Sequence, residues 1–310
     1  MISNSLVENP LVTVIVLAYN QPEFLNQAIE SVCAQTFSDY ELLVIDDCSG
    51  EDITNQYRLP ENARLICLHE HFGGDTRGRN VGVKEAKGKY IAFLDNDDVW
   101  FPDKLETQVR LLDDNPDAVL VYSHYIVTDS SLTPRPKQDK FELPAPDMIR
   151  QLIHGCFIHS PSAVLIKRDV IIKNGCFDES LLSGTDWDMW RRLSTKFRFV
   201  PDPIPRIYYR IHSAQISENF EKKAFFRVKG LTKTLEQMKL NSPKHVRYAR
   251  IRLSWALRKF AKLKMAKKNS LSEIKPLLLH AIAVWPWNIK SYLLLAWLPF
   301  YAAFRRSNDK

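Results

Sequence analysis

Three carboxylates lie within four positions of one short segment. Asp95, Asp97 and Asp98 follow an apolar run in the stretch YIAFLDNDDVW, residues 90–100. Crowded carboxylates repel one another, and carboxylate oxygens are the ligands that Mg²⁺ and Mn²⁺ prefer. Mg²⁺ usually takes only one or two of them and completes its shell with phosphate oxygens. The Asp95-x-Asp97 pair therefore predicts a divalent-cation site for a phosphate-bearing ligand; the alternative is a solvated turn with helix-capping aspartates.

Polar residues end other apolar runs in the same way: Asn20 follows one run, and Asp46 and Asp47 close another. Continuous apolar, β-branched runs are typical of strands buried on both faces. They predict strands at 11–19, 40–47, 63–68, 89–94 and 118–123. Between them, helices are predicted over 22–34, after a glycine-rich turn in 73–88, and over 101–114. From 147 to 212 the pattern is mixed, with SAVLIK a strand and DWDMWRRLSTK a helix.

This alternation of strands and helices predicts an α/β fold, a mostly parallel sheet flanked by helices. In such sheets ligands bind beyond the carboxyl ends of the strands. The polar residues follow the carboxyl ends of their strands, so we expect them to gather at one edge of one sheet.

Five segments, in order over roughly residues 11–215, resemble the large family 2 of inverting glycosyltransferases. They are VTVIVLAYN, YELLVIDDCSGED, GRNVGVKEAKGKYIAFLDNDDVWFPDKL, GCFDESLLSGTDWDMWRRL and YRIH. The resemblance implies a GT-A, Rossmann-like fold and a donor that is a nucleotide-diphospho-sugar, in this family most often a UDP-sugar. It also implies an acceptor hydroxyl on a saccharide or a lipid-linked molecule, in the synthesis of cell-surface polysaccharide or glycan.

The resemblance assigns donor binding to residues at strand ends and on one helix. These are Ala18, Tyr19, Asn20, Asp46, Asp47, Arg79, Asp95 and Asn96. The corner at 18–20 would lie along the nucleoside, and Asp47 with Asp46 would accept hydrogen bonds from the base or ribose. Arg77 or Arg79 would face the base or diphosphate, with Arg79 preferred because it stands at the family's Arg-Asn position, and Asp95 would face the ribose or the metal. Each assignment has an alternative without a ligand. Tyr19 would simply end a strand, Asp46 and Asp47 would cap a helix, and Arg79 would be a solvated charge. His71 is set aside as less suited to a role.

The resemblance also implies a metal, Mn²⁺ or Mg²⁺, held by Asp97 between the two donor phosphates. A divalent ion there stabilises the departing nucleotide as a Lewis acid. In some family members a histidine at the position of His212, in YRIHSAQIS, adds a ligand. Imidazole suits Mn²⁺ better than Mg²⁺; a surface histidine is the alternative. Asp98 would support the loop or cap the following helix.

Inverting transfer is one in-line displacement in which the acceptor hydroxyl loses its proton to a general base. The resemblance places this base at Asp186, in GTDWDMW. Family members usually show Glu-Asp here and this chain has Thr185-Asp186, so Asp188 stays open as an alternative base. Asp186 also suits a helix N-cap.

Two other readings of the whole chain remain open. Thr185 stands where the family usually has Glu, so a non-catalytic protein that binds a nucleotide-sugar stays among the alternatives. A nucleotidyltransferase also uses paired aspartates at a sheet edge. However, AYNQPEF, after the first strand, has neither the glycine nor the cation of that class's phosphate loop.

Charge divides the chain in two. Residues 1–220 hold 22 Lys and Arg against 32 Asp and Glu, whereas residues 221–310 hold 21 against 4, a net charge of +17. We predict a catalytic domain at 1–220, with its nucleotide-sugar half at 1–125 and its acceptor half at 126–220. The proline-rich segment 132–146 is a connector or an acceptor-side lid. We expect 221–310 to be a helical, basic extension, with apolar residues among the cations at 251–263.

The two longest uncharged runs of this extension, 276–289 and 291–304, hold 14 residues each. That is short of the ~20 needed to span a bilayer. Trp and Tyr beside Lys and Arg suit an interfacial helix, so 241–310 is predicted to meet an anionic membrane surface; ordinary packing helices are the alternative.

Nucleic acid is not expected as a partner, because the chain shows no recognition motif and its main body is acidic. The first ten residues, MISNSLVENP, show no signal-peptide pattern, and the five cysteines are scattered without CxxC spacing. Both observations favour a cytoplasmic location, peripheral on the inner membrane face.

Overall fold

The computed structural model of the chain describes residues 9–71, 75–212 and 220–308. It divides into two compact units. One comprises Met1–Met148 and Cys156–Gln215, and the other Ile149–Gly155 and Ile216–Lys310. Each is described by itself.

In its described part, the larger unit is built on one eight-stranded sheet of order β3-β2-β1-β4-β7-β6-β8-β5. The strands are β1 Val12–Ala18, β2 Tyr40–Asp46, β3 Ala63–Cys67, β4 Tyr90–Asp95, β5 Val99–Trp100, β6 Ala118–Thr128, β7 Val164–Lys167 and β8 Arg198–Arg210. Neighbours among β1–β4 pair in parallel, as do β6 and β8. β7 runs antiparallel to β4 and β6, and β5 antiparallel to β8. The predicted α/β fold with a mostly parallel sheet is confirmed.

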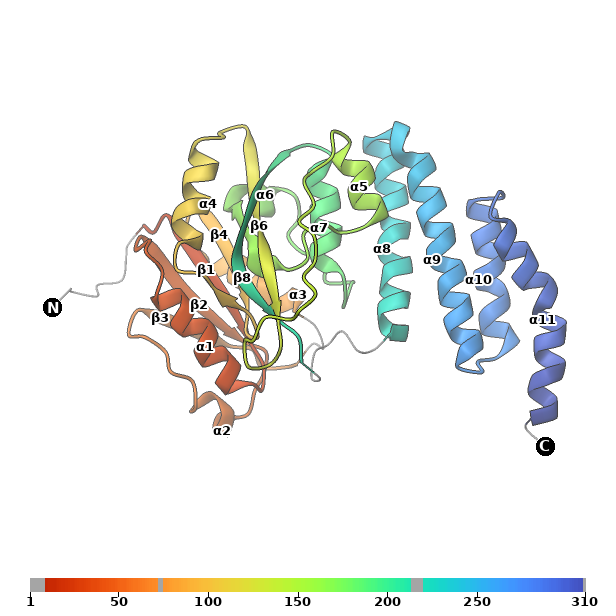
Figure 1. The fold of residues 1–310 in the computed structure, drawn as a ribbon, viewed down its shortest axis with the longest axis horizontal. Coiled ribbons are helices and arrows are strands. Elements are labelled where there is room, and N and C mark those ends of the chain that lie inside the picture. The colour runs from red at the N-terminus through yellow and green to blue at the C-terminus, as the bar shows by residue number, and fades with distance from the viewer. Residues whose placement is uncertain (1–8, 72–74, 213–219, 309–310) are drawn as a thin grey trace. The chain divides into compact units, whose positions relative to one another are not determined.

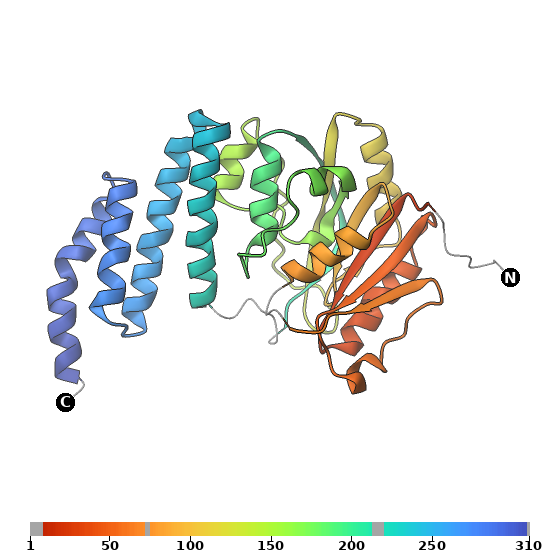
Figure 2. The same cartoon turned by 180° about the vertical axis from the view of Figure 1, so that it is seen from behind.

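Helices cover both faces of this sheet (Figures 1 and 2). They are α1 Pro22–Cys33, α2 Glu51–Thr54, α3 Thr76–Glu85, α4 Lys104–Asp113, α6 Arg168–Lys173 and α7 Thr185–Ser194. On one face α1 and α4 bury Leu25 and Leu105 in the core that also holds Val14 of β1. On the other face α3 approaches closely through Gly82, where a Cβ would lie 2.6 Å from Ile15 Cγ2. The strands β1, β2 and β4 are thus covered on both faces, leaving their ends to carry polar side chains.

The smaller unit is helical: α5 Met148–His154, α8 Phe220–Asn241, α9 Val246–Ala266, α10 Leu271–Val284 and α11 Ile289–Asn308. From α8 to α11 the helices stand side by side in chain order, with α8 and α11 at the two ends of the row (Figures 1 and 2). Leu231 of α8 and Leu253 of α9 share a core with Ile153 of α5. Of the helices in the described ranges, none is long and apolar enough to cross a bilayer.

Candidate active site

The sheet brings three of the predicted segments together. In the strand register Ala18 of β1 lies beside Asp46 of β2, and Leu17 beside Asp95 of β4. The backbone N–H of Asp47 donates to the carbonyl oxygen of Ala18 at 2.9 Å. Because these strands are parallel and adjacent, the polar residues that end them share one edge.

The corner between β1 and β2 is held from inside by Asp46. Its carboxylate is fully buried and accepts from the Ser49 N–H at 2.8 Å, the Ser49 hydroxyl at 2.6 Å and the Tyr57 hydroxyl at 2.7 Å. Asn20 has a left-handed φ of 49°, which asparagine tolerates, and its N–H donates to Ser49 Oγ at 3.0 Å. Asp46 and Asn20 therefore shape the corner through Ser49.

Tyr19 and Asp47 meet at the outer side of this corner, and both contact His71. The rings of Tyr19 and His71 stack with centroids 4.2 Å apart, and His71 Nδ1 lies 2.7 Å from Asp47 Oδ2. The histidine that the sequence analysis set aside thus connects two of the residues assigned to the nucleoside.

Arg79 on α3 points into the carboxylate cluster. Its side chain is 4% exposed, and Nη2 lies 2.7 Å from Asp95 Oδ1 and 3.2 Å from Asp75 Oδ2. Burial alone would lower the pKa of Arg79, but the two carboxylates outweigh it and raise that pKa above its ordinary value. Burial raises the pKa of Asp95 to about 6, although Arg79 opposes the shift. Arg79 is therefore an internal counter-charge of the site and not a solvated arginine.

The neighbour of Arg79 fixes the loop that leads to α7. Asn80 Nδ2 donates to the Phe177 carbonyl at 2.9 Å, and Asn80 Oδ1 accepts from the Phe177 N–H at 2.9 Å. The Arg-Asn pair thus ties α3 to the end of β4 on one side and to the segment before α7 on the other.

Asp97 and His212 face each other across 115 residues of sequence. His212 Nε2 lies 3.2 Å from Asp97 Oδ2, and the side chains are 8% and 21% exposed. Asn96 is half-buried in the same turn, between β4 and β5. Arg210 fixes this turn, because its Nε donates to the Asp97 carbonyl at 2.8 Å.

Asp98 points inward from the turn. It accepts from the Ser160 hydroxyl at 3.0 Å and from the Arg210 N–H at 3.3 Å. Burial, with the charges of Asp97 and Asp95, raises its pKa well above the ordinary value. Asp98 therefore supports the turn between β4 and β5. This is one of the two roles predicted for it, the other being the cap of the following helix.

The donor atoms around Asp97 decide whether this turn could hold a divalent cation. Among the described residues, no group of three or more His, Cys, Asp or Glu side chains is placed to hold a metal ion by itself. Asp97 and His212 do offer one oxygen and one nitrogen donor that already touch. One carboxylate and one imidazole fit Mn²⁺ or Mg²⁺ when phosphate oxygens complete the shell.

Asp186 joins the cluster from the first turn of α7. Burial raises the pKa of its carboxyl, and Arg79 lowers it in part. The pKa of half-buried Tyr209 is raised by burial and then by Asp98, Asp97, Asp95 and Asp186. The charge of Asp186 thus acts on Arg79 and on Tyr209, and the charge of Asp95 acts on the same two residues.

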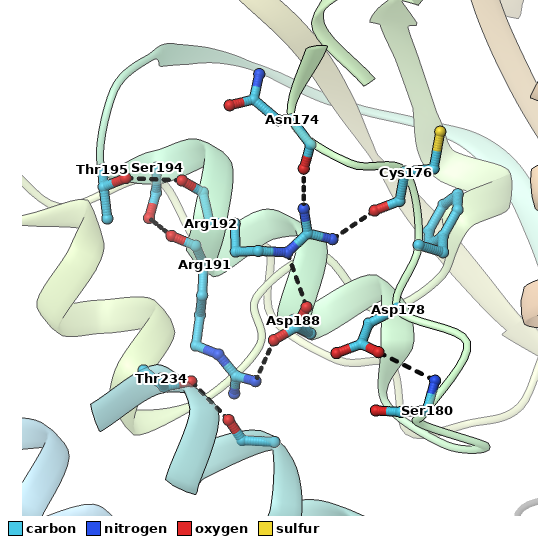
Figure 3. Close-up of polar contacts among 12 residues, drawn as sticks. Asn174, Cys176, Asp178, Ser180, Asp188, Arg191, Arg192, Ser194, Thr195 and Thr234 are labelled. Carbon is cyan, nitrogen blue, oxygen red and sulfur yellow. Dashed lines mark hydrogen bonds and ion pairs between the residues drawn. The ribbon is translucent and has the colours of Figure 1, made fainter. Parts of the chain in front are cut away.

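Asp188 has a different environment (Figure 3). It is 1% exposed, with Oδ2 2.9 Å from Arg192 Nε and Oδ1 3.6 Å from Arg191 Nη2. The Arg192 guanidinium also donates to the carbonyl oxygens of Asn174 and Cys176. These contacts make Asp188 an internal anchor that fixes α7 to the preceding loop.

Comparison with known proteins decides the family. The model of Glycosyl transferase family 2 matches residues 13–175. The chain belongs to glycosyl transferase family 2. A family 2 relative, an uncharacterized glycosyltransferase of Rickettsia prowazekii, is 34% identical over 219 residues, 67% of this chain and 66% of its own length. The chain spans between 31% and 66% of the length of five rickettsial relatives.

Two further likenesses concern one glycosyltransferase named for its activity and one solved structure. The UDP-Glc:alpha-D-GlcNAc-diphosphoundecaprenol beta-1,3-glucosyltransferase WfaP of Escherichia coli is 28% identical over 211 residues, 67% of this chain and 80% of its own length. The structure of S. aureus TarS 1–349 with UDP-GlcNAc has a TM-score of 0.65 at 20% identity, covering 87% of this chain and 79% of its own. The second is a likeness of fold, and it agrees with the GT-A fold that the resemblance implied.

Sequence reasoning gave His71 no role, and it missed two other residues of the candidate site, Tyr209 and Arg210. The last two lie within the YRIH motif, and their local sequence carries no sign that they meet a turn more than 100 residues earlier. His71 stands just before a glycine pair, which was the only signal available for it.

Proposed function

We propose that this chain is a metal-dependent, inverting glycosyltransferase that moves a sugar from a nucleotide-diphospho-sugar, in the first instance a UDP-sugar, to a hydroxyl of a saccharide or lipid-linked acceptor. The observation that carries the proposal is the contact of Asp97 with His212 at the end of the sheet edge, in a member of this family. The printed activity of WfaP and the UDP-GlcNAc complex of TarS support the donor class. WfaP also supports a role in cell-surface glycan synthesis.

In this proposal the nucleoside lies along the corner at Ala18–Asn20. Tyr19 offers a ring face for the base, and Asp47 accepts from the base or ribose. Asp46 keeps the corner in shape through Ser49 and Tyr57. Asp95, held by Arg79 at 2.7 Å, presents its second carboxylate oxygen toward the donor, with Asn96 beside it.

Asp97 and His212 would hold Mn²⁺ or Mg²⁺. When bound, such an ion supplies Lewis-acid stabilisation of the diphosphate leaving group. Arg210 contributes by fixing the backbone of Asp97, so that the carboxylate meets the imidazole from a rigid turn.

Asp186 is proposed as the general base that takes the proton of the acceptor hydroxyl. Its raised pKa makes it a stronger base than an ordinary aspartate. Asp188 suits this role poorly, because two arginines neutralise it in a buried position.

The domain organisation is also part of the proposal. Residues 1–220 form the catalytic domain, with its nucleotide-sugar half at 1–125, and residues 221–310 form a basic helical region. A lipid-linked acceptor would lie at a membrane. Attachment of 241–310 to the inner, anionic face would bring the acceptor to the enzyme.

A donor screen by calorimetry tests the proposal. UDP-, GDP- and dTDP-sugars are titrated into the protein with Mn²⁺ and, in parallel, with a chelator. We expect one UDP-sugar to bind with Mn²⁺ and to lose most of its affinity without it. Equal binding of every donor in chelator would contradict the proposal.

A further inference from the structure

Helix α11 has apolar residues on two opposite sides. One side is buried in the smaller unit, where Leu298 and Tyr301 pack with Leu278 of α10. The Tyr301 hydroxyl donates to the Met265 carbonyl at 3.2 Å. These contacts fix which side of α11 faces its neighbours.

The other side of α11 is apolar and open to water. Ile289, Leu293 and Phe300 are 68%, 64% and 69% exposed, and Trp297 is 48% exposed. Their spacing of four, four and three residues places them on one helix face. Trp287, in the turn before the helix, is 78% exposed. We call these five residues the α11 face.

A helix that is apolar on both sides normally has a partner on both sides. The stretch 291–304 contains no Asp, Glu, Lys or Arg, so no charged residue lies between Leu293 and Phe300 in the sequence. Within the smaller unit, α11 is the last helix of its row, next to α10 (Figures 1 and 2). The α11 face is therefore a docking surface, and its chemistry points to one occupant.

We propose that the α11 face binds an anionic lipid bilayer, with the helix lying in the membrane interface. Lys290 is exposed at the start of the helix, Arg305 and Arg306 follow the uncharged stretch in sequence, and residues 221–310 carry a net charge of +17. Exposed tryptophans among apolar residues between cations are typical of interfacial helices. A second copy of the chain would bring two strongly cationic units together, whereas anionic lipid neutralises them.

The structure also identifies the helix that carries this contact. The sequence predicted membrane contact for the whole of 241–310, which includes the basic helix with apolar residues at 251–263. In the structure Leu253, Leu257 and Phe260 of that helix are buried, so its apolar face is already used within the unit. α11 therefore offers a row of exposed apolar side chains to lipid, whereas α9 exposes Trp255, at 43%, among its cations and adds positive charge. This lipid contact rests on the proposed function, because it would give the enzyme access to a lipid-linked acceptor.

Vesicle flotation tests the α11 face without donor, metal or acceptor. The full chain is mixed with vesicles of phosphatidylcholine alone or with about 30 mol% phosphatidylglycerol. We expect flotation with the anionic vesicles only, weakened by high salt. L293Q/F300Q should lower the partition coefficient at least about tenfold, because two apolar side chains no longer leave water.

A matched control uses the same two residue types elsewhere in this unit. Phe220 and Leu240 on α8 are 70% and 82% exposed, and F220Q/L240Q should float like the wild type. Trp287→Gln, in the turn outside the helix, is a second test variant in case L293Q/F300Q alters the helical circular dichroism. It should lower flotation as well.

Three outcomes would overturn the proposal. They are no flotation of the wild type, equal loss in F220Q/L240Q, and a wild-type dimer in solution that L293Q/F300Q dissociates, which would make a second copy the occupant. Donor binding is measured separately in solution. A chain that floats but binds no donor contradicts the proposed function alone, and one that binds donor but does not float contradicts only the lipid surface.

Discussion

His71 lies flat against Tyr19, with ring centroids 4.2 Å apart and planes 10° apart. The same imidazole places Nδ1 2.7 Å from Asp47 Oδ2. A planar ring that stacks on Tyr19 and contacts Asp47 makes both contacts proposed for the nucleobase. His71 therefore competes with the donor for this corner, and the base must displace it.

Removing this competitor should strengthen nucleotide binding. We expect His71→Ala to raise the affinity for UDP with Mn²⁺ about five- to thirtyfold, because the contact with the Asp47 carboxylate and the aromatic contact with Tyr19 are each worth roughly 0.5–1 kcal/mol. Calorimetry measures the change, and His69→Ala, at an exposed histidine two residues earlier, should change nothing. A weaker affinity in His71→Ala would mean instead that the imidazole helps to hold the base.

The contact of Asp97 with His212 predicts which variants lose metal dependence. We expect Asp97→Asn to remove the gain in donor affinity that Mn²⁺ gives. His212→Ala should lower Mn²⁺ affinity by at least the roughly 10–100-fold that loss of a supporting residue costs. Calorimetry with and without Mn²⁺ separates the two. Asp117→Asn, at an aspartate whose side chain is 65% exposed, is the control. A full Mn²⁺ effect in Asp97→Asn would exclude that carboxylate as a ligand.

The parallel half of the sheet could be predicted because β1, β2 and β4 are continuous apolar runs. β8 could not. Its 13 residues include Pro201, Pro203 and Pro205 and several charges, a composition that argues against a strand. It forms because β6 supplies a long partner, with register shifts along the pair. β5 holds two residues, too few to leave a pattern.

Candidate site residues at the ends of strands could be predicted from the sequence. Those placed by contacts between segments far apart in the sequence were harder to predict. Asp46 and Asp47 are alike in sequence, yet one is sealed behind Ser49 and Tyr57 and the other faces His71. Arg210 is one charge in a charged strand until the fold carries it to the Asp97 carbonyl. Such differences depend on tertiary packing, which local sequence does not record.

The proposed base gives a clear kinetic prediction. Asp186→Asn should lower kcat for sugar transfer by about 10²–10⁴-fold, the usual worth of a general base. It should leave Mn²⁺-dependent donor binding within about threefold of the wild type, since the donor contacts proposed here do not include Asp186. Transfer assayed with saturating donor, beside calorimetry, distinguishes the two effects. Transfer that survives the substitution would move the base elsewhere.

The pH profile should report the same group. Burial raises the pKa of Asp186, and the base must be ionised, so the acidic limb of kcat/KM should lie above the ordinary aspartate value of about 3.9. Arg79 lowers this pKa. Arg79→Gln should therefore move the limb to higher pH, and Arg79→Lys, which keeps the charge, should move it less. A limb that does not respond to the charge at position 79 would contradict this assignment.

Asp188 should matter for stability and not for chemistry. Asp188→Asn leaves Arg191 and Arg192 without their buried counter-charge, and breaking a buried pair from one side costs about 3–5 kcal/mol. Asp169→Asn is the matched control. Asp169 pairs with Lys173 at the same four-residue spacing, but both side chains are at least 60% exposed, so its loss should cost less than about 1 kcal/mol. Urea unfolding gives both free energies, and transfer is normalised to folded protein. If Asp188→Asn unfolds no more readily than Asp169→Asn and yet abolishes transfer, Asp188 and not Asp186 takes the proton.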